Sequence, residues 1–129
     1  MDNSLNYSVA EKKNPRTPEK EGMYYAHVRT RGVLSKDDLI DRIDRRGSVG
    51  KPDIVSVLLN LEDVVTEALC SGEIVRLGEL GSLSLSISSE GCKNIEDFCS
   101  NNITKVRAIF KEGKTLKRGI SRLHFKKVK

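Results

Sequence analysis

The strongest chemical signal in the chain is a concentration of positive charge toward its C-terminal end. Between Lys105 and Lys129 there are ten basic residues and one acidic residue, Glu112, so this segment carries a net charge of +9. The whole chain carries +5, which leaves −4 for all other residues. A basic segment on an acidic body attracts polyanions, of which nucleic acid is the commonest inside a cell. The pattern indicates a nucleic-acid ligand, and the alternative is a solvated basic face without a partner.

A second unusual stretch, VRLGELGSLSLS from Val75 to Ser86, places two glycines between strand-like segments. After the glycines, leucine or isoleucine alternates with serine as far as Ser88, which predicts a strand with one buried face and one small polar face. Gly78 and Gly81 can take backbone conformations closed to other residues, or let another backbone come close. The stretch therefore predicts a tight corner, either a simple hairpin turn or a place where backbone approaches a ligand.

A short amphipathic helix is expected well before this corner, in LSKDDLIDRIDRRG. Ser35 can cap its start, and the acidic residues that follow favour the positive end of a helix. Leu39, Ile40 and Ile43 fall on one face, and Gly47 is a stop signal.

A longer helix is expected next, beginning at Pro52, whose missing N–H would have no partner in a first helical turn. Apolar residues then recur at spacings of three and four as far as Leu69, and Gly72 ends the pattern. Val57 and Leu59 are apolar outside the main stripe, so the helix has more apolar surface than one small sheet can cover. This surplus predicts a homodimer.

The elements after the corner form an arm, a strand, a helix and a last strand. Residues 88–104 are polar and irregular, and one lysine against three acidic residues gives them a net charge of −2. They predict a long connection or protruding arm. KVRAIF (105–110) reads as a strand, KEGKTLKRGISRL (111–123) contains a short basic helix, and HFKKV (124–128) is a possible strand. Its expected partner is the aromatic-rich MYYAHV at 23–28.

The N-terminal residues are expected to form an appendage. Residues 1–22 mix prolines, glycine and charges with few apolar side chains, so a loose or extended arm without a role in the core is expected. With the short strand at 23–28 this makes an N-terminal extension over 1–33, followed by one domain over 34–129.

Composition argues against several other classes of protein. No apolar run approaches the roughly 20 residues that cross a bilayer, and the N-terminus lacks the order of a secretory signal. A soluble, intracellular protein is expected. At 129 residues with 37% hydrophobic and 5% aromatic residues, the chain supports only a modest core.

Catalytic and metal-binding chemistry have no support. The cysteines are odd in number and none has C-x-x-C spacing, and the two histidines have no ligand at a suitable spacing. Ser82 lies in no nucleophile motif, GELG is too short for a phosphate loop, and Asp37 and Asp38 stabilise a helix start. The protein is therefore not expected to be an enzyme or to need a metal or cofactor.

In its order of elements the chain resembles the bacterial histone-like HU and integration-host-factor proteins, over about residues 34–123. The matching stretches are KDDLIDRI, SGEIVRLGELGSLSLS and FKEGKTLK. The resemblance implies an α+β fold of two N-terminal helices, a three-stranded antiparallel sheet with a protruding arm and a short C-terminal helix, here with extra terminal strands. In the family, an intertwined dimer forms a saddle for DNA and its two arms wrap the minor groove.

The resemblance also suggests which residues would contact DNA. Gly81 and Ser82 match the corner whose backbone meets phosphate, Arg76 precedes it, and Lys114 and Lys117 match the basic positions of the family's GK-x-L-K segment. Their role would be phosphate neutralisation, which requires charge and reach but no base-specific geometry. The charge pattern adds four more expected DNA-binding residues, Lys105, Arg107, Lys111 and Arg118.

The chain departs from the family in its arm. Family arms are basic and carry an RNP turn whose proline wedges between base pairs, whereas residues 88–104 contain neither proline nor arginine. Leu80 replaces a phenylalanine between the corner glycines, and the two terminal segments are additions. The arm is not expected to clamp a duplex in the usual way.

Two functions follow from the resemblance and the departures. The first is an HU-like architectural homodimer, cytoplasmic and nucleoid-associated, that contacts the backbone or minor groove of double-stranded DNA with little sequence specificity. The second is an HU-fold module for protein interaction or assembly, in which DNA binding is weak or lost. Neither involves a membrane or a small-molecule substrate.

Overall fold

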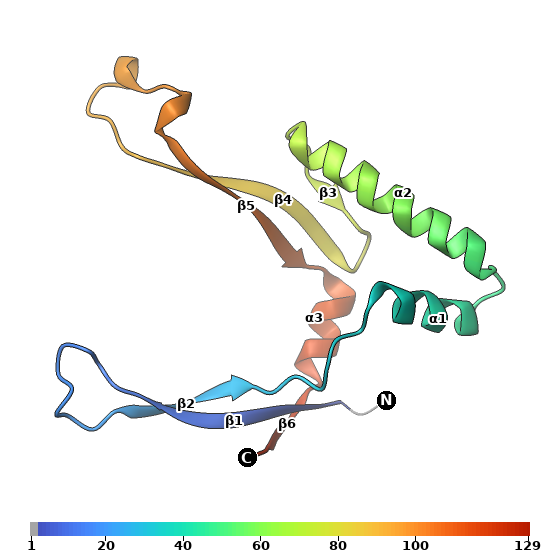
Figure 1. The fold of residues 1–129 in the computed structure, drawn as a ribbon, viewed down its shortest axis with the longest axis horizontal. Helices are drawn as coiled ribbons and strands as arrows, with labels where there is room; N and C mark the ends of the chain where they lie inside the picture. The colour runs from blue at the N-terminus through green and yellow to red at the C-terminus, as the bar shows by residue number, and fades with distance from the viewer. Residues whose placement is uncertain (1–2) are drawn as a thin grey trace. The chain divides into compact units, whose positions relative to one another are not determined.

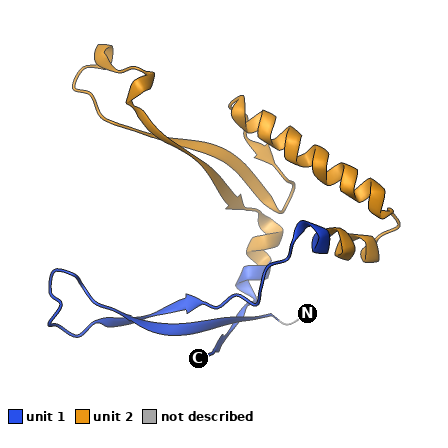
Figure 2. Cartoon of the chain, viewed as in Figure 1, with its two compact units in different colours: residues 1–39, 119–129 blue, residues 40–118 orange. Residues whose placement is uncertain are grey.

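The computed structural model describes residues 3–129, which fall into two compact units (Figure 2). One unit combines the chain as far as Leu39 with Gly119–Lys129, and the other is Ile40–Arg118. The regular elements in chain order are β1 (Ser4–Lys12), β2 (Met23–Val28), α1 (Lys36–Arg46), α2 (Lys51–Cys70), β3 (Val75–Arg76), β4 (Gly81–Ser89), β5 (Ile103–Glu112), α3 (Lys114–Ser121) and β6 (His124–Lys127), as labelled in Figure 1. Two single 3₁₀ turns, at 95–97 and 100–102, lie between β4 and β5.

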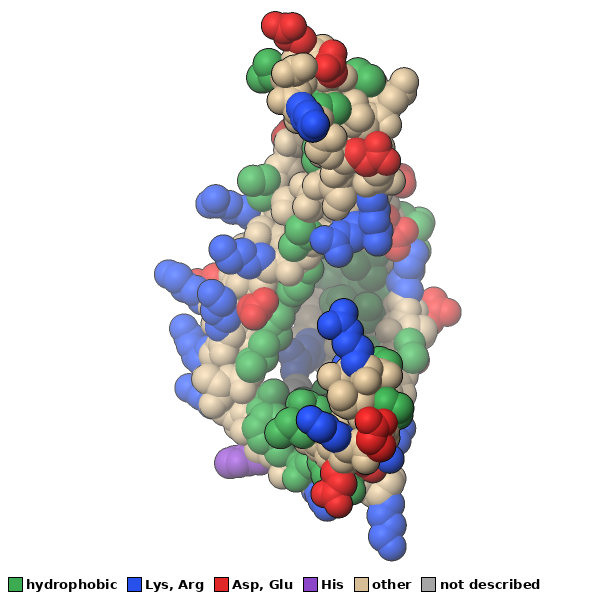
Figure 3. Space-filling view, turned by 90° about the vertical axis from the view of Figure 1, so that its left-hand side faces the viewer, with side chains coloured by type: hydrophobic (Ala, Val, Ile, Leu, Met, Phe, Trp, Pro, Cys, Tyr) green, Lys and Arg blue, Asp and Glu red, His purple; other side chains and the backbone are tan. Residues whose placement is uncertain are grey.

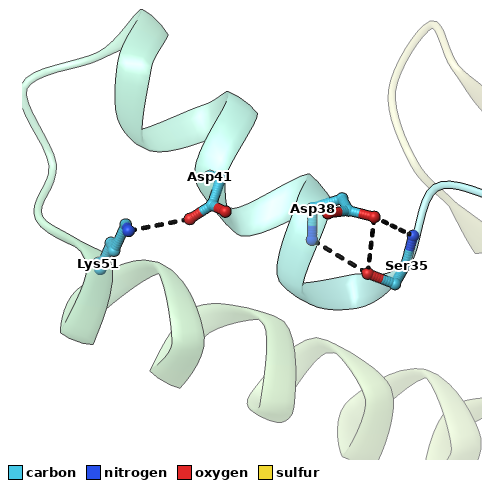
Figure 4. Close-up of polar contacts among 4 residues, drawn as sticks. All are labelled: Ser35, Asp38, Asp41 and Lys51. Carbon is cyan, nitrogen blue, oxygen red and sulfur yellow. Dashed lines mark hydrogen bonds and ion pairs between the residues drawn. The ribbon is translucent and has the colours of Figure 1, made fainter.

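The start of α1 is capped by Ser35, as the sequence predicts, and the structure adds a reciprocal bond from Asp38. The Asp38 amide donates to Ser35 Oγ at 3.2 Å, and the Asp38 carboxylate accepts from the Ser35 amide at 3.1 Å and from its hydroxyl at 2.9 Å (Figure 4). This pairing satisfies backbone donors that a helix start leaves without intrahelical partners. Of the apolar stripe, Ile40 is buried, whereas Leu39 and Ile43 are exposed.

The second helix also begins and ends close to the expected residues. Gly50 is its N-cap, Pro52 lies in its first turn, and Gly72 follows its end with a φ of 91°. The Lys51 ammonium pairs with the Asp41 carboxylate of α1 at 2.9 Å (Figure 4). The hydrogen bond to Asp41 and then the charge of Asp41 raise the pKa of Lys51. This ion pair joins the two helices across their connection.

Strands β3, β4 and β5 form an antiparallel sheet in that order, which confirms the expected three-stranded sheet. Leu83, Leu85 and Ile87 on β4 stand opposite Phe110, Ala108 and Val106 on β5, so one face of the sheet is apolar. A groove between this sheet and α2 is lined by Leu61, Val65, Leu77 and Leu83.

The hydrophobic core within one chain is small. Among the described residues, only Ile40 and Ile54 are buried hydrophobic side chains. Many apolar side chains of the helix and the sheet remain exposed, among them Val57 at 63% and Ile87 at 60%. A single chain therefore leaves much of its apolar surface in contact with water.

The unit that combines the chain as far as Leu39 with Gly119–Lys129, here called the terminal unit, differs from expectation in two respects. Residues 4–12, expected as part of a loose arm, form β1, the central strand of a second sheet in the order β2-β1-β6. The expected pairing of β2 with β6 is also wrong, because β1 lies between them, antiparallel to β2 and parallel to β6. Both errors have one cause: Leu5, Tyr7 and Val9 alternate with polar residues, which gives β1 an apolar face despite its polar average.

No helix within the described residues is long and apolar enough to cross a membrane.

Candidate nucleic-acid interface

The face of the β3-β4-β5 sheet opposite the apolar one carries serines and cations. Residues directly opposite one another in an antiparallel pair share a face. Arg76 stands opposite Ser82, and Ser82 stands opposite Lys111. These three side chains form a row across all three strands, with neighbouring strands about 4.8 Å apart.

The same face continues along β4 and β5 away from this row. Ser86 pairs with Arg107 and Ser88 with Lys105, while Ser84 stands opposite Ile109. We call this surface the basic face; it consists of Arg76, Ser82, Ser84, Ser86, Ser88, Lys105, Arg107, Ile109 and Lys111. All four of its cations are exposed, so their charge is available to a ligand.

The corner at the end of the basic face is shaped by its two glycines. The turn closes through a hydrogen bond from the Leu77 amide to the Gly81 carbonyl at 2.8 Å, and Gly78 has a φ of 60°. Gly81 is buried with a φ of 154°, and a Cβ there would lie 2.5 Å from the Lys111 carbonyl oxygen and 2.7 Å from the Phe110 ring. The close approach that requires Gly81 is thus to strand β5 of its own chain.

The corner is also held against the start of α3. The Gly113 amide donates to the Leu80 carbonyl at 2.9 Å, and the Thr115 amide donates to the Glu79 carbonyl at 3.1 Å. The Thr115 hydroxyl donates to the Glu79 carboxylate at 3.1 Å. A Cβ on Gly113 would meet the Glu79 carbonyl, so this contact also depends on a glycine. This contact is not predictable from the sequence, because neither GELG nor EGKT gives a local signal for it.

The remaining expected site residues lie on α3. Lys114, Lys117 and Arg118 occupy positions i, i+3 and i+4, which places them on one side of a helix. The structure therefore groups the nine expected residues into three sets. Arg76, Ser82, Lys105, Arg107 and Lys111 share the basic face, Gly81 shapes the corner, and the three α3 cations follow the corner on a separate element.

The arm between β4 and β5 has the opposite charge. Glu90, Glu96 and Asp97 lie in or beside its short turns with Lys93, and acidic side chains gather at its tip in Figure 3. Ile95 is 91% exposed at this tip. Eight residue steps along β4, about 27 Å at 3.4 Å per residue, separate the corner from the start of the arm. One hairpin thus carries cations toward its base and anions at its tip.

Among residues 3–129, no three histidine, cysteine, aspartate or glutamate side chains form a group that could hold a metal ion.

Comparison with solved structures identifies similar folds. A candidate bacterial DNA-binding protein from Bacteroides vulgatus ATCC 8482 matches 98% of the chain at 18% identity with a TM-score of 0.69. This chain spans only about half of that protein, because the match covers 49% of it. The HU of Anabaena, crystallised with DNA, matches 68% of the chain at 22% identity with a TM-score of 0.53, and the match covers 98% of that protein. A search of curated proteins gives no match.

A match to a sequence family assigns the chain to a protein family. The family described as "HU domain fused to wHTH, Ig, or Glycine-rich motif" matches residues 3–127, which include both sheets and all three helices. With the two-helix start, the three-stranded sheet and the charged arm already described, this match shows that the chain is a divergent HU-like protein and belongs to the family of HU domains fused to wHTH, Ig or glycine-rich motifs.

Proposed function

We propose that the protein is an HU-like architectural DNA-binding protein that contacts the duplex backbone through the basic face and α3. The observation that carries the proposal is the arrangement of the basic face. Its cations alternate along β5 and extend across the sheet to Arg76, with serines between them. Lysine and arginine neutralise phosphates, and small hydroxyls let a backbone approach and donate hydrogen bonds to it.

The proposed DNA contacts involve side chains near the glycine corner. Ser82, Arg76 and Lys111 would meet phosphates at the base of the hairpin, and Lys105 and Arg107 would continue that track toward the arm. Lys114, Lys117 and Arg118 would add charge from α3. Gly81 would act indirectly, since it is buried and allows the turn that places Ser82 beside Lys111.

A homodimer is part of this proposal. Its support is the apolar surface that a single chain leaves exposed on α2 and on the apolar face of the β3-β4-β5 sheet. The exposed residues concerned are Val55, Val57, Leu59, Leu61, Val64, Leu85, Ile87, Val106 and Phe110. A second copy that covers them would complete the core and place two basic faces on one particle.

Titration of labelled duplex DNA at two salt concentrations, with the mass in solution measured alongside, tests the proposal. Affinity should fall by about 0.9 log units per log unit of salt for each phosphate neutralised. The mass should be at least twice 14.4 kDa. Lys114→Glu with Lys117→Glu should cause a large loss of affinity, and absence of binding at low salt would end the proposal.

The second candidate, a protein-interaction module, rests on the arm. An acidic tip repels phosphate, and Ile95 at 91% exposure is an apolar side chain available to a protein partner. Under this alternative the lysine reversals on α3 would leave function unchanged, whereas substitutions at the tip would remove it. The two sets of variants therefore separate the candidates.

A further inference from the structure

The β2 strand is an edge of the terminal sheet and has no charged side chain on it. All six residues of MYYAHV are exposed. The Arg29 amide donates to the Asn6 carbonyl, so alternation along the strand turns the amides and carbonyls of Val28, Ala26 and Tyr24 away from β1. These groups form a row of backbone donors and acceptors ready to pair with another strand.

The other edge of the same sheet is different. Strand β6 has only four residues, and two of them, Lys126 and Lys127, are cations. Short length and lysines are common means of preventing pairing between edge strands. Only β2 therefore combines free backbone groups with the absence of charge that pairing with an identical strand requires.

We propose that β2 pairs antiparallel with β2 of a second copy and joins two terminal sheets into one of six strands. The outward backbone groups fix the register: Ala26 lies opposite Ala26 of the second copy, and Tyr24 lies opposite Val28 of the second copy. This register uses every outward donor and acceptor of the strand. It is two-fold symmetric, so each copy contributes the same surface.

The side chains agree with this register. Tyr24 and Val28 are 70% and 58% exposed and lie on the face of the sheet that also carries Leu5, Tyr7 and Phe125, which line an apolar groove. Pairing an aromatic with a β-branched residue across strands is favourable. The apolar surface of one sheet then continues onto the next.

Charges beyond the strand ends are complementary in the same register. Continuing the pairing by two or three residues at each end brings Glu21 level with Arg31 of the second copy. This register thus brings no like charges together at these positions, although the Arg31 guanidinium also donates to the Ser4 carbonyl of its own chain at 3.1 Å. This interface uses none of the residues of α2, so a chain that also pairs through α2 would link dimers into larger assemblies.

Cross-linking tests the register directly. In a background with serine at Cys70, Cys92 and Cys99, Ala26→Cys should react with a short thiol cross-linker to give covalent dimers. The matched control is Val9→Cys, on the same face but one strand inward, whose two copies would be about 14 Å apart. We expect cross-linking at position 26 to be at least tenfold faster; equal rates at the two positions would overturn the proposal.

A charge at the two-fold centre gives a second test. Ala26→Lys places two like charges opposite each other, whereas Ala26→Thr keeps an uncharged residue that suits a strand. In sedimentation, the largest species of the Lys variant should have half the mass of the largest species of the unaltered protein. The Thr variant should keep the unaltered mass. Equal mass distributions for both variants and the unaltered protein would contradict the proposal, and so would unlimited aggregation that A26K does not reduce. None of these measurements involves DNA, so they remain informative if the DNA-binding proposal fails.

Discussion

The base and the tip of the β4–β5 hairpin are parts of one element with opposite chemistry. At the base, cations and serines share a face, and two glycines let the chain turn tightly beside β5 and α3. At the tip, the exposed Ile95 is followed by Glu96 and Asp97 in one short turn, and a second short turn of Ser100–Asn102 comes next. The corner lies about 27 Å from the start of the arm, so the acidic tip cannot neutralise the cations at the corner within one hairpin.

If the proposed DNA binding holds, this difference would separate affinity for the duplex from wrapping of the duplex. A basic arm would extend the phosphate contacts around the duplex, whereas an acidic arm restricts them to the base of the hairpin and to α3. Bound DNA should then be held by the basic face and α3 alone.

The largest effect is expected from reversing charge on the basic face. Arg107→Glu with Lys111→Glu should lower affinity for duplex DNA by about a thousandfold at moderate salt, because each dimer loses four phosphate contacts and gains repulsion. The slope of log affinity against log salt should also become shallower. The control is Lys12→Glu with Lys13→Glu, which changes net charge equally on the terminal hairpin. Equal losses from the two pairs would mean that total charge matters and the basic face does not.

The corner should be the next most sensitive feature. Gly81→Ala should lower the free energy of unfolding by roughly 2–4 kcal/mol, since a Cβ meets backbone and the Phe110 ring at a positive φ. Gly78→Ala is the matched control, because its φ is 60° but its Cβ would meet open space. Gly78→Ala should lower the free energy of unfolding by about 1–2 kcal/mol. Denaturant unfolding measures both, and similar values would show that packing against β5 is not what requires Gly81.

Neutralising the tip should have a smaller effect of opposite sign. Glu96→Gln with Asp97→Asn should raise affinity for DNA about threefold at low salt and have no effect at high salt, because exposed charges are screened within about 10 Å at 0.1 M salt. Salt-dependent titration measures the change. A loss of affinity would show that the carboxylates make a favourable contact with the complex.

The smallest effect on DNA binding is expected from Ile95. If the arm does not insert into the duplex, Ile95→Ser should leave affinity and DNA bending within about twofold, because no base step is opened by an apolar wedge. Bending can be followed by energy transfer between dyes at the duplex ends. A strong loss of bending would mean that isoleucine replaces the family's proline.

The two long helices and the β4 strand could be predicted from sequence because their signals are local. The cap at Ser35, the stop at Gly72 and the alternation of serine with leucine each act within a few residues, and the helices and the β4 strand occur where these patterns predict them. The basic face could also be anticipated, since alternation along β5 puts Lys105 and Arg107 on one side.

The contacts that escaped prediction join distant residues. Thr115 reaches Glu79 across 36 positions, and no local pattern marks either residue as a partner. Strand β1 was missed for a different reason. Averaging composition over residues 1–22 hid the alternation of Leu5, Tyr7 and Val9, which is a sufficient signal for a strand when the segment is considered alone.

The parallel pairing of β1 with β6 has a consequence for how the protein is made. Ser4 pairs with His124 and Tyr7 with Lys127, so the central strand of the terminal sheet receives one of its neighbours from nearly 120 residues later in the chain. During synthesis at roughly 5–20 residues per second, β1 is made several seconds before that neighbour. The helices and the hairpin, whose partners lie closer in sequence, can form first on the ribosome. The sheet of β1, β2 and β6 is therefore expected to close after the helices and the β4–β5 hairpin.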